Sequence, residues 1–297
     1  MFEYWIFLVL LAQFMNAVVV LVDRHLVRSP AIDKPIVYAF YVSVLSGVVI
    51  LLLPFGVVLS PTIQVIQLSL LAGVSYTIFI LLLYKSLKIS DASDVAPVVG
   101  AVGALATFVF SLIFLGESLS GNFLLGFMFL VAGTFVMSYF RFTKKVVIFT
   151  ILSGISFGIS SVFIKDLFNQ TTFWNGFFWS RMANVVVILL FMIWPSNFKI
   201  VWKNLWSSSI GAKSAVVANK VLAGFAFLLI LYSINLGNVS VVNALGGMQF
   251  AFLLLLAFLF TKKFPEYFSE SVHHGHVIAQ KSVATVLIIF GLILLFR

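Results

Sequence analysis

Apolar runs of the length that crosses a lipid bilayer recur along the whole chain. A helix rises about 1.5 Å per residue, so about 20 residues cover the hydrocarbon core. The pattern predicts an all-α polytopic membrane protein with ten transmembrane helices. The expected spans lie at roughly 4–22, 36–54, 64–84, 94–115, 122–140, 146–164, 173–194, 210–232, 239–260 and 281–296.

The second half of the chain weakly repeats the first. A shift of 141 positions pairs Arg24 with Lys165 and Pro54 with Pro195, and a shift of 148 later pairs Tyr84 with Tyr232. We therefore expect two five-helix repeats, 1–143 and 144–297. Because five is odd, the second repeat enters the membrane from the other side, which makes an inverted repeat.

Basic residues mark one side of the predicted membrane protein. The net charge is +9, but the basic residues lie mostly in short loops beside apolar runs, which favours the lipid bilayer as partner and no nucleic acid. The positive-inside rule makes this side cytoplasmic and both termini external. Fourteen of the 18 Lys and Arg residues follow the odd-numbered helices: Arg24, Arg28, Lys34, Lys85, Lys88, Arg141, Lys144, Lys145, Lys199, Lys203, Lys213, Lys262, Lys263 and Lys281.

Several short motifs resemble the EamA-type members of the drug/metabolite transporter (DMT) superfamily. They are the loop Leu115–Leu119 (LGESL), the turn Tyr84–Ser93, and Gly126 and Gly133 in helix 5. The second-half loop Thr261–Glu266 is a degraded version of the first. The resemblance implies two EamA-like repeats, metabolite transport and a plasma membrane location. It also implies cytoplasmic termini, opposite to the charge pattern, so both orientations stay open.

A cation lies well inside the seventh apolar run. Arg181 shares a helix face with Trp174, Phe178 and Asn184. An arginine in mid-membrane costs about 2.5–3.5 kcal/mol on insertion scales, so it normally faces a polar interior. It could bind an anionic substrate, or it could tie together backbone carbonyls or a neighbouring asparagine.

A second cation, Lys220, lies at similar depth in the next run, and no carboxylate lies at that depth in the sequence. Its face also carries Ala223, Gly224 and Phe227. Lys220 could contact substrate, stay uncharged, or pair with Asn219 or Asn243. Inverted-repeat transporters bind substrate at the midplane between repeats, so the two cations could share one site.

Other polar residues in the spans are further candidates for substrate binding. Interhelical hydrogen bonds would explain them equally well. The pair Gly246-Gly247 could free backbone carbonyls for a ligand or admit a close neighbour. The candidates are Asn243 and Gln249 in helix 9, Gln13 and Asn16 in helix 1, and Tyr76 in helix 3.

Catalytic, cofactor and metal chemistry have little support in the sequence. The chain has no cysteine, nucleotide-binding loop or Ser/His/Asp set, so we expect no enzyme and no cofactor. His273, His274 and His276 with Glu270 have metal-ligand spacing, but a solvated loop is the favoured interpretation and no metal is expected. Gly154-x-x-x-Gly158 indicates helix packing inside the bundle, with a homodimer as the alternative.

Two functions fit these features. The first is a secondary transporter that moves a small anionic or zwitterionic metabolite by alternating access between the two repeats. The second is a membrane-embedded lipid-carrier binding protein, or a flippase accessory protein, without solute transport. No intramembrane carboxylate is present to serve as an acidic proton relay, which favours exchange or a substrate gradient as the driving force.

Overall fold

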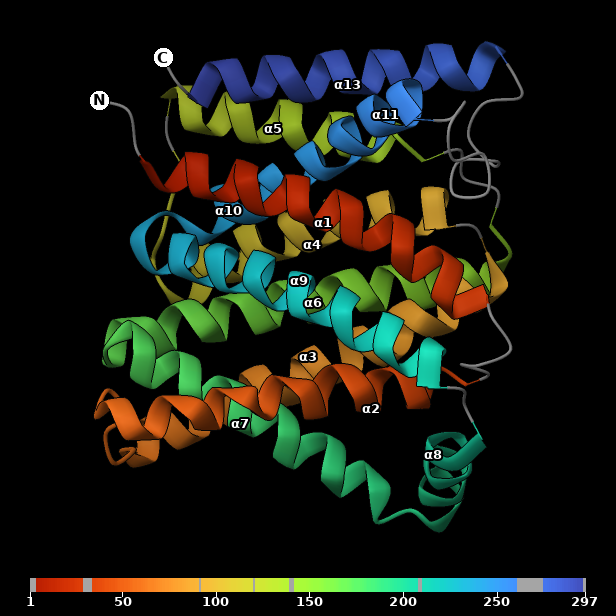
Figure 1. Cartoon of the computed structure of the whole chain (residues 1–297). Coiled ribbons are helices and arrows are strands. Elements are labelled where there is room, and N and C mark those ends of the chain that lie inside the picture. The colour runs from red at the N-terminus through yellow and green to blue at the C-terminus, as the bar shows by residue number, and fades with distance from the viewer. Residues whose placement is uncertain are drawn as a thin grey trace.

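The computed structural model describes residues 4–28, 34–90, 92–119, 121–138, 142–207, 210–260 and 275–295. These residues are helical almost throughout and contain no strand, which confirms the all-α class. Most helices run side by side along one direction, and α1 begins at the same end of the bundle at which α13 ends (Figure 1). We call this the terminal end and the opposite one the basic end.

Twelve α-helices and two 3-10 helices make up most of the described residues. In chain order they are α1 (Tyr4–Arg28), α2 (Pro35–Leu45), η1 (Ser46–Phe55), α3 (Ile63–Ile89), α4 (Ala92–Phe114), α5 (Gly121–Val136), α6 (Lys144–Gln170), α7 (Phe173–Met192), α8 (Pro195–Ser207), α9 (Ile210–Leu236), α10 (Val239–Ala244), η2 (Leu245–Gly247), α11 (Met248–Phe260) and α13 (Gly275–Leu295). The last begins six residues earlier than predicted, at Gly275.

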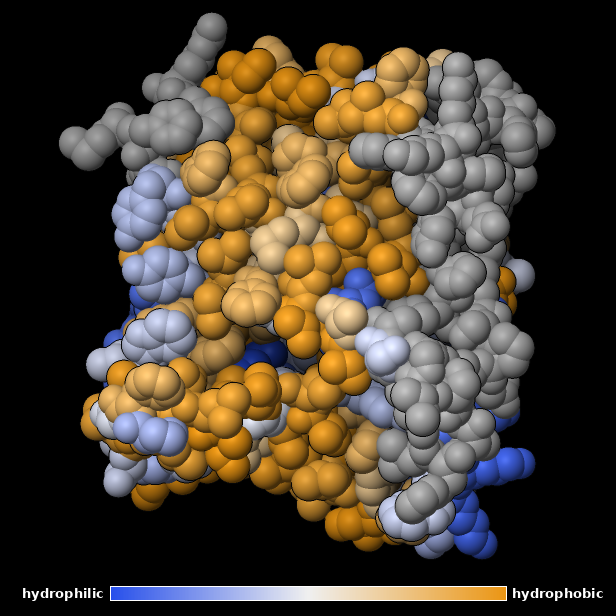
Figure 2. All heavy atoms as spheres, in the orientation of Figure 1, coloured by the Kyte–Doolittle hydropathy of each residue, from blue (hydrophilic) through white to orange (hydrophobic). Residues whose placement is uncertain are grey.

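The apolar helices lie where membrane spans were predicted, and the ten-span inverted repeat stays a prediction. Eight helical segments in the described residues are long and apolar enough to cross a membrane, and two shorter apolar helices coincide with the remaining predicted spans. Large apolar side chains cover much of the outer surface, as Figure 2 shows for one face. Phe258, for example, is 87% exposed. Such a surface is stable only against lipid, so the chain is a multi-pass membrane protein.

Two predicted spans are not continuous α-helices. The span 36–54 is α-helical to Leu45 and then 3-10 up to Phe55. The span 239–260 is divided into α10 and α11 by the 3-10 turn η2. A side chain at Gly247 would collide with Thr134 of α5, whereas one at Gly246 would meet no atom within 4 Å. The close-neighbour interpretation of this glycine pair is therefore confirmed for Gly247.

The connection between α7 and α9, predicted as a loop, is the helix α8. Proline is favoured in the first helical turn, where its missing N–H needs no partner, and Pro195 stands there. Phe198 and Trp202 stack at 5.6 Å on its exposed side, and Val201 is buried against the bundle. At 13 residues α8 is too short to span a membrane, and it points away from the bundle direction (Figure 1).

The helix α6 is central in the packing, since it lies against both α3 and α4, while α1 packs along α9 and α5 along α13. The glycine face of α6 allows a close approach to α4. A Cβ atom at Gly158 would lie 2.7 Å from Ala106 Cβ and 2.7 Å from the backbone nitrogen of Thr107. This agrees with packing of the Gly154–Gly158 face inside the chain, and the homodimer stays a prediction.

The α4–α6 contact generates a stability prediction. Gly158→Ala should lower stability by about 1–3 kcal/mol, because the new methyl group meets backbone atoms that cannot move aside cheaply. Gly224→Ala is the matched control, since a Cβ atom there meets nothing within 4 Å, and alanine is the better helix former. Thermal unfolding in detergent measures both variants. An unchanged midpoint for Gly158→Ala would contradict the packing described here.

Candidate functional site

Arg181 lies between two aromatic rings from two other helices. It is 4% exposed. Its Cζ atom lies 5.3 Å from the ring centroid of Tyr76 on α3 and 4.7 Å from that of Phe227 on α9. Its Nε also donates to Ser180 Oγ at 3.5 Å. Cation–π contacts contribute about 0.5–2 kcal/mol, most when desolvated, so Arg181 links α7 to both α3 and α9.

Asn184 lies one turn along α7 from Arg181, on the same face. Its side chain is fully buried, and neither Nδ2 nor Oδ1 has a hydrogen-bond partner among the described residues. An unsatisfied buried polar group costs about 1–3 kcal/mol. A buried amide with both its donor and its acceptor available, next to a buried cation, is the feature expected of a ligand site.

Lys220 of α9 contacts a second aromatic group. Its Nζ lies 4.5 Å from the ring centroid of Tyr38 on α2, and that ring packs edge-on against Tyr84 of α3 at 4.5 Å. Asn219 and Asn243, the two amides that the sequence offers as partners of Lys220, each bond to another helix. Asn219 donates to the Val19 carbonyl at 3.2 Å, and Asn243 donates to Thr107 Oγ1 at 2.7 Å.

The two cations border one space between helices. Lys220, Gly224 and Phe227 lie on one face of α9, and a Cβ atom at Gly224 would meet no atom within 4 Å. α9 packs mainly along α1 and only little along α7. Figure 2 shows the molecular face hollowed where α9 lies beside α2 in Figure 1, with hydrophilic atoms deep among apolar ones. We call this space the central gap.

Of the predicted site residues, Arg181 and Tyr76 contact each other beside Phe227 of α9, and Lys220 lies on the same face of α9. Asn184 shares the α7 face of Arg181. Sequence reasoning missed Tyr38, for which the sequence carries no signal. It placed Phe227 on the Lys220 face but did not include that ring in the site.

The other predicted site residues make their described contacts elsewhere and stay predictions. Trp174 is 41% exposed and packs on Phe173 and Phe177, and Phe178 is buried beside Trp179. The remaining members are Asn243, bonded to Thr107; Gln13 and Asn16, 3.4 Å apart on α1; and the partly exposed Gln249 of α11.

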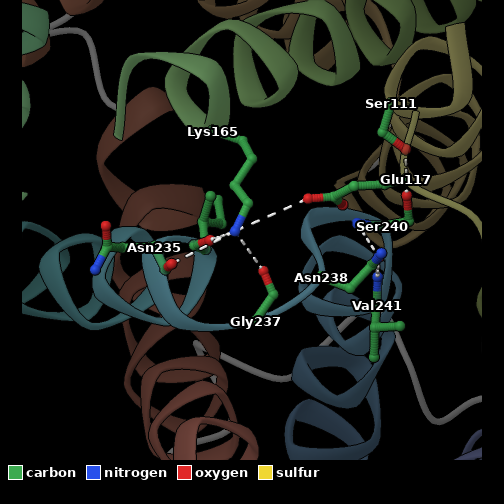
Figure 3. A network of polar contacts seen from close by, with 9 residues as sticks. Ser111, Glu117, Lys165, Asn235, Gly237, Asn238, Ser240 and Val241 are labelled. Atoms are coloured by element: carbon green, nitrogen blue, oxygen red, sulfur yellow. Dashed lines mark hydrogen bonds and ion pairs between the residues drawn. The ribbon is translucent and has the colours of Figure 1, made fainter. Parts of the chain in front are cut away.

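A third cation, Lys165, lies at the C-terminal end of α9 (Figure 3). Lys165 of α6 donates to the carbonyl oxygens of Ile234 and Gly237 at 2.9 Å each and approaches that of Asn235 at 3.4 Å. Its Nζ also lies 3.9 Å from Glu117 Oε1. The last carbonyls of a helix have no partner inside the helix and attract cations, so Lys165 caps α9.

The Lys165 network joins the two halves of the chain. Glu117 belongs to the LGESL loop after α4, whereas Lys165 and the α9–α10 connection come from the second half. Asn238 begins α10 by accepting from the N–H groups of Ser240 and Val241 (Figure 3). The sequence motif identified Glu117 but not its partner, because Lys165 looked like an ordinary charge at a helix end.

Of the predicted histidine cluster, His276 lies within the described residues. Glu270, His273 and His274 lie outside the described residues. Within the residues that the structure does describe, no group of His, Asp and Glu side chains could hold a metal ion.

A multi-pass helical bundle with buried cations around a gap is typical of a membrane transporter. The comparison with protein families agrees: residues 3–139 match the model of the EamA-like transporter family. The match confirms the resemblance drawn from the motifs, and residues 3–139 are similar to this family of DMT-type membrane transporters.

The whole chain shares its fold with known structures, and 27 chains of solved structures match it. One, described simply as the crystal structure of a protein, is 17% identical with a TM-score of 0.66 and covers 98% of this chain and 94% of its own. At that identity the likeness shows the fold alone. No curated protein sequence matches the chain.

The Lys165 network generates a second stability prediction. Lys165→Met should lower stability by about 3 kcal/mol, because it leaves Glu117 and the end of α9 without their buried partner. Asp166→Asn is the control, since Asp166 contacts Gln170 at 3.5 Å on the exposed surface, and such changes stay within about 0.5 kcal/mol. Thermal unfolding compares the two variants. Equal midpoints would show that Lys165 does not stabilise this end.

Proposed function

We propose that the protein is a secondary transporter of a small anionic or zwitterionic metabolite that binds in the central gap. The observation that carries this proposal is the pairing of the buried Arg181 with the unsatisfied Asn184 on one face of α7. The chemistry of the two side chains defines the kind of ligand. The plasma membrane and the possible homodimer belong to the same proposal.

The Arg181 guanidinium is suited to a carboxylate or phosphate group. Aromatic rings lie near it from α3 and α9, and its terminal N–H groups are the donors that we propose for the ligand. These donors match the paired oxygens of such anions. Asn184 adds one acceptor and two donors beside them. An anion that carries a neighbouring donor, as a zwitterion does, would satisfy both side chains at once.

The helix packing supports alternating access between two inverted repeats. The repeat alignment pairs α1 with α6 and α3 with α9. The contact between α3 and α6 therefore corresponds to the contact between α9 and α1, and both pairs pack extensively. The correspondence is incomplete, because α3 also packs along α7 while α9 does not pack comparably along α2. This asymmetry is what one open and one closed pathway would produce.

The closed pathway lies at the terminal end. The Lys165 network holds the end of α9 there, and Phe173 of α7 packs against Tyr232 of α9 at 5.0 Å. We therefore propose that the gap opens toward the basic end, and that separation of these contacts opens the other end during transport.

Binding through Arg181 is tested with purified protein and a panel of carboxylates, phosphorylated metabolites and amino acids. A ligand that raises the unfolding temperature should bind about 10- to 100-fold more weakly to Arg181→Gln, because a hydrogen bond to a charged group contributes about 1.5–3 kcal/mol. Lys199→Gln, the same charge change on the exposed side of α8, should bind normally.

The same ligands are then tested for uptake into proteoliposomes. Ligands that bind Arg181→Gln as well as wild type would exclude the proposed site. Co-purified lipid together with absence of any solute flux would instead support the lipid-carrier function.

The access pathway is tested with single cysteines, since the chain has none of its own. In sealed vesicles, Gly224→Cys should react with a membrane-impermeant thiol reagent from the basic end alone. Adding Lys165→Met should make it reactive from the terminal end too. Ala226→Cys on the same helix, fully buried in wild type, should stay unreactive. Labelling of Gly224→Cys from the terminal end without the second change would reverse the proposed direction.

A further inference from the structure

The two cations in the central gap lie at different depths, in contrast to the similar depth expected from the sequence. Arg181 contacts Phe227 of α9, which is seven residues from Lys220 on the same helix. At 1.5 Å per residue, this places the two levels about 10 Å apart along α9.

The helix α3 gives an independent estimate of the same separation. Arg181 contacts Tyr76, and Lys220 contacts Tyr38, whose ring packs on Tyr84. Tyr76 and Tyr84 are eight residues apart on α3, or about 12 Å. The spacings on α9 and α3 thus both place the two cations too far apart to bind the same carboxylate or phosphate group.

The stretch between the cations is open and apolar. On α9 it runs Val-Leu-Ala-Gly-Phe-Ala from 221 to 226, without a charged or polar side chain. Ala223 and Gly224 turn toward the Lys220–Phe227 face, and a Cβ atom at Gly224 would meet nothing within 4 Å. Phe227 and Tyr76 border this stretch at the Arg181 level, and both are only partly buried. An apolar chain could lie along this surface without loss of any hydrogen bond.

From this geometry we infer that the site selects elongated dianions, with one anionic group at Arg181 and Asn184, a second at Lys220, and an apolar middle. The inference rests on the proposed function and specifies its substrate class. A short anion would occupy the Arg181 level alone, whereas a molecule of matching length would engage both cations. In an extended eight-carbon α,ω-diacid the carboxyl carbons are seven bonds apart, about 9 Å, which is close to the cation separation.

The test measures binding of α,ω-dicarboxylates of four, six, eight and ten carbons to the purified full chain by titration calorimetry. Suberate, the eight-carbon member, should bind about tenfold more tightly than succinate and than its own monomethyl ester, because it gains a second charge-assisted contact. Lys220→Gln should reduce suberate to the affinity of the monomethyl ester, while Lys199→Gln should leave the chain-length preference intact.

A second variant tests the inference in case Lys220→Gln does not fold. Gly224→Phe fills the space between the two cations and should weaken suberate binding more than succinate binding. If short carboxylates bind in an Arg181-dependent way but suberate gains nothing from its length or from Lys220, the inference is wrong and the proposed function stands. If no carboxylate binding depends on Arg181, the proposed function itself fails and the inference with it.

Discussion

A polar group within the hydrocarbon region of a membrane must find its partner inside the protein, and this requirement determines most of the structure. Asn243 meets it by bonding to Thr107 across α10 and α4, and Ser160 by donating to the Ala72 carbonyl across α6 and α3. Lys165 meets it with the carbonyls at the end of α9. Such contacts fix which helices are neighbours, because few alternative partners exist in lipid.

Against that background, the places where the requirement is not met are informative. Asn184 is fully buried with neither polar atom bonded among the described residues, and Arg181 relies largely on aromatic rings. Both lie on the α7 face that meets α3 and the central gap. A protein that leaves an amide and a guanidinium incompletely satisfied in mid-membrane is more stable once a polar ligand or water completes them. Affinity for a ligand and incomplete pairing without it are thus two aspects of one arrangement.

The fold could be predicted from the sequence because the bilayer reduces the choice of structure to helices of known length. The LGESL loop at Leu115–Leu119 and the position of Arg181 in its apolar run could also be identified from the sequence. Contacts between distant helices could not be predicted from it. Nothing in the sequence distinguishes Tyr38 from the other aromatic residues that line the spans. Lys165 was misjudged because the apolar run stops at Ile164, whereas α6 continues to Gln170 and directs the lysine to α9.

The helix α8 has a consequence for the mechanics of the two helices beside the gap. Stacked Phe198 and Trp202, with Lys199 and Lys203 adjacent to them, give α8 the composition of a helix that rests in the lipid headgroup layer. Aromatic and basic side chains at that level resist displacement along the membrane normal. Because α8 follows α7 directly, the headgroup layer sets the depth of Arg181. In the proposed transporter, the membrane surface therefore helps to set the depth at which an anion would reach Arg181.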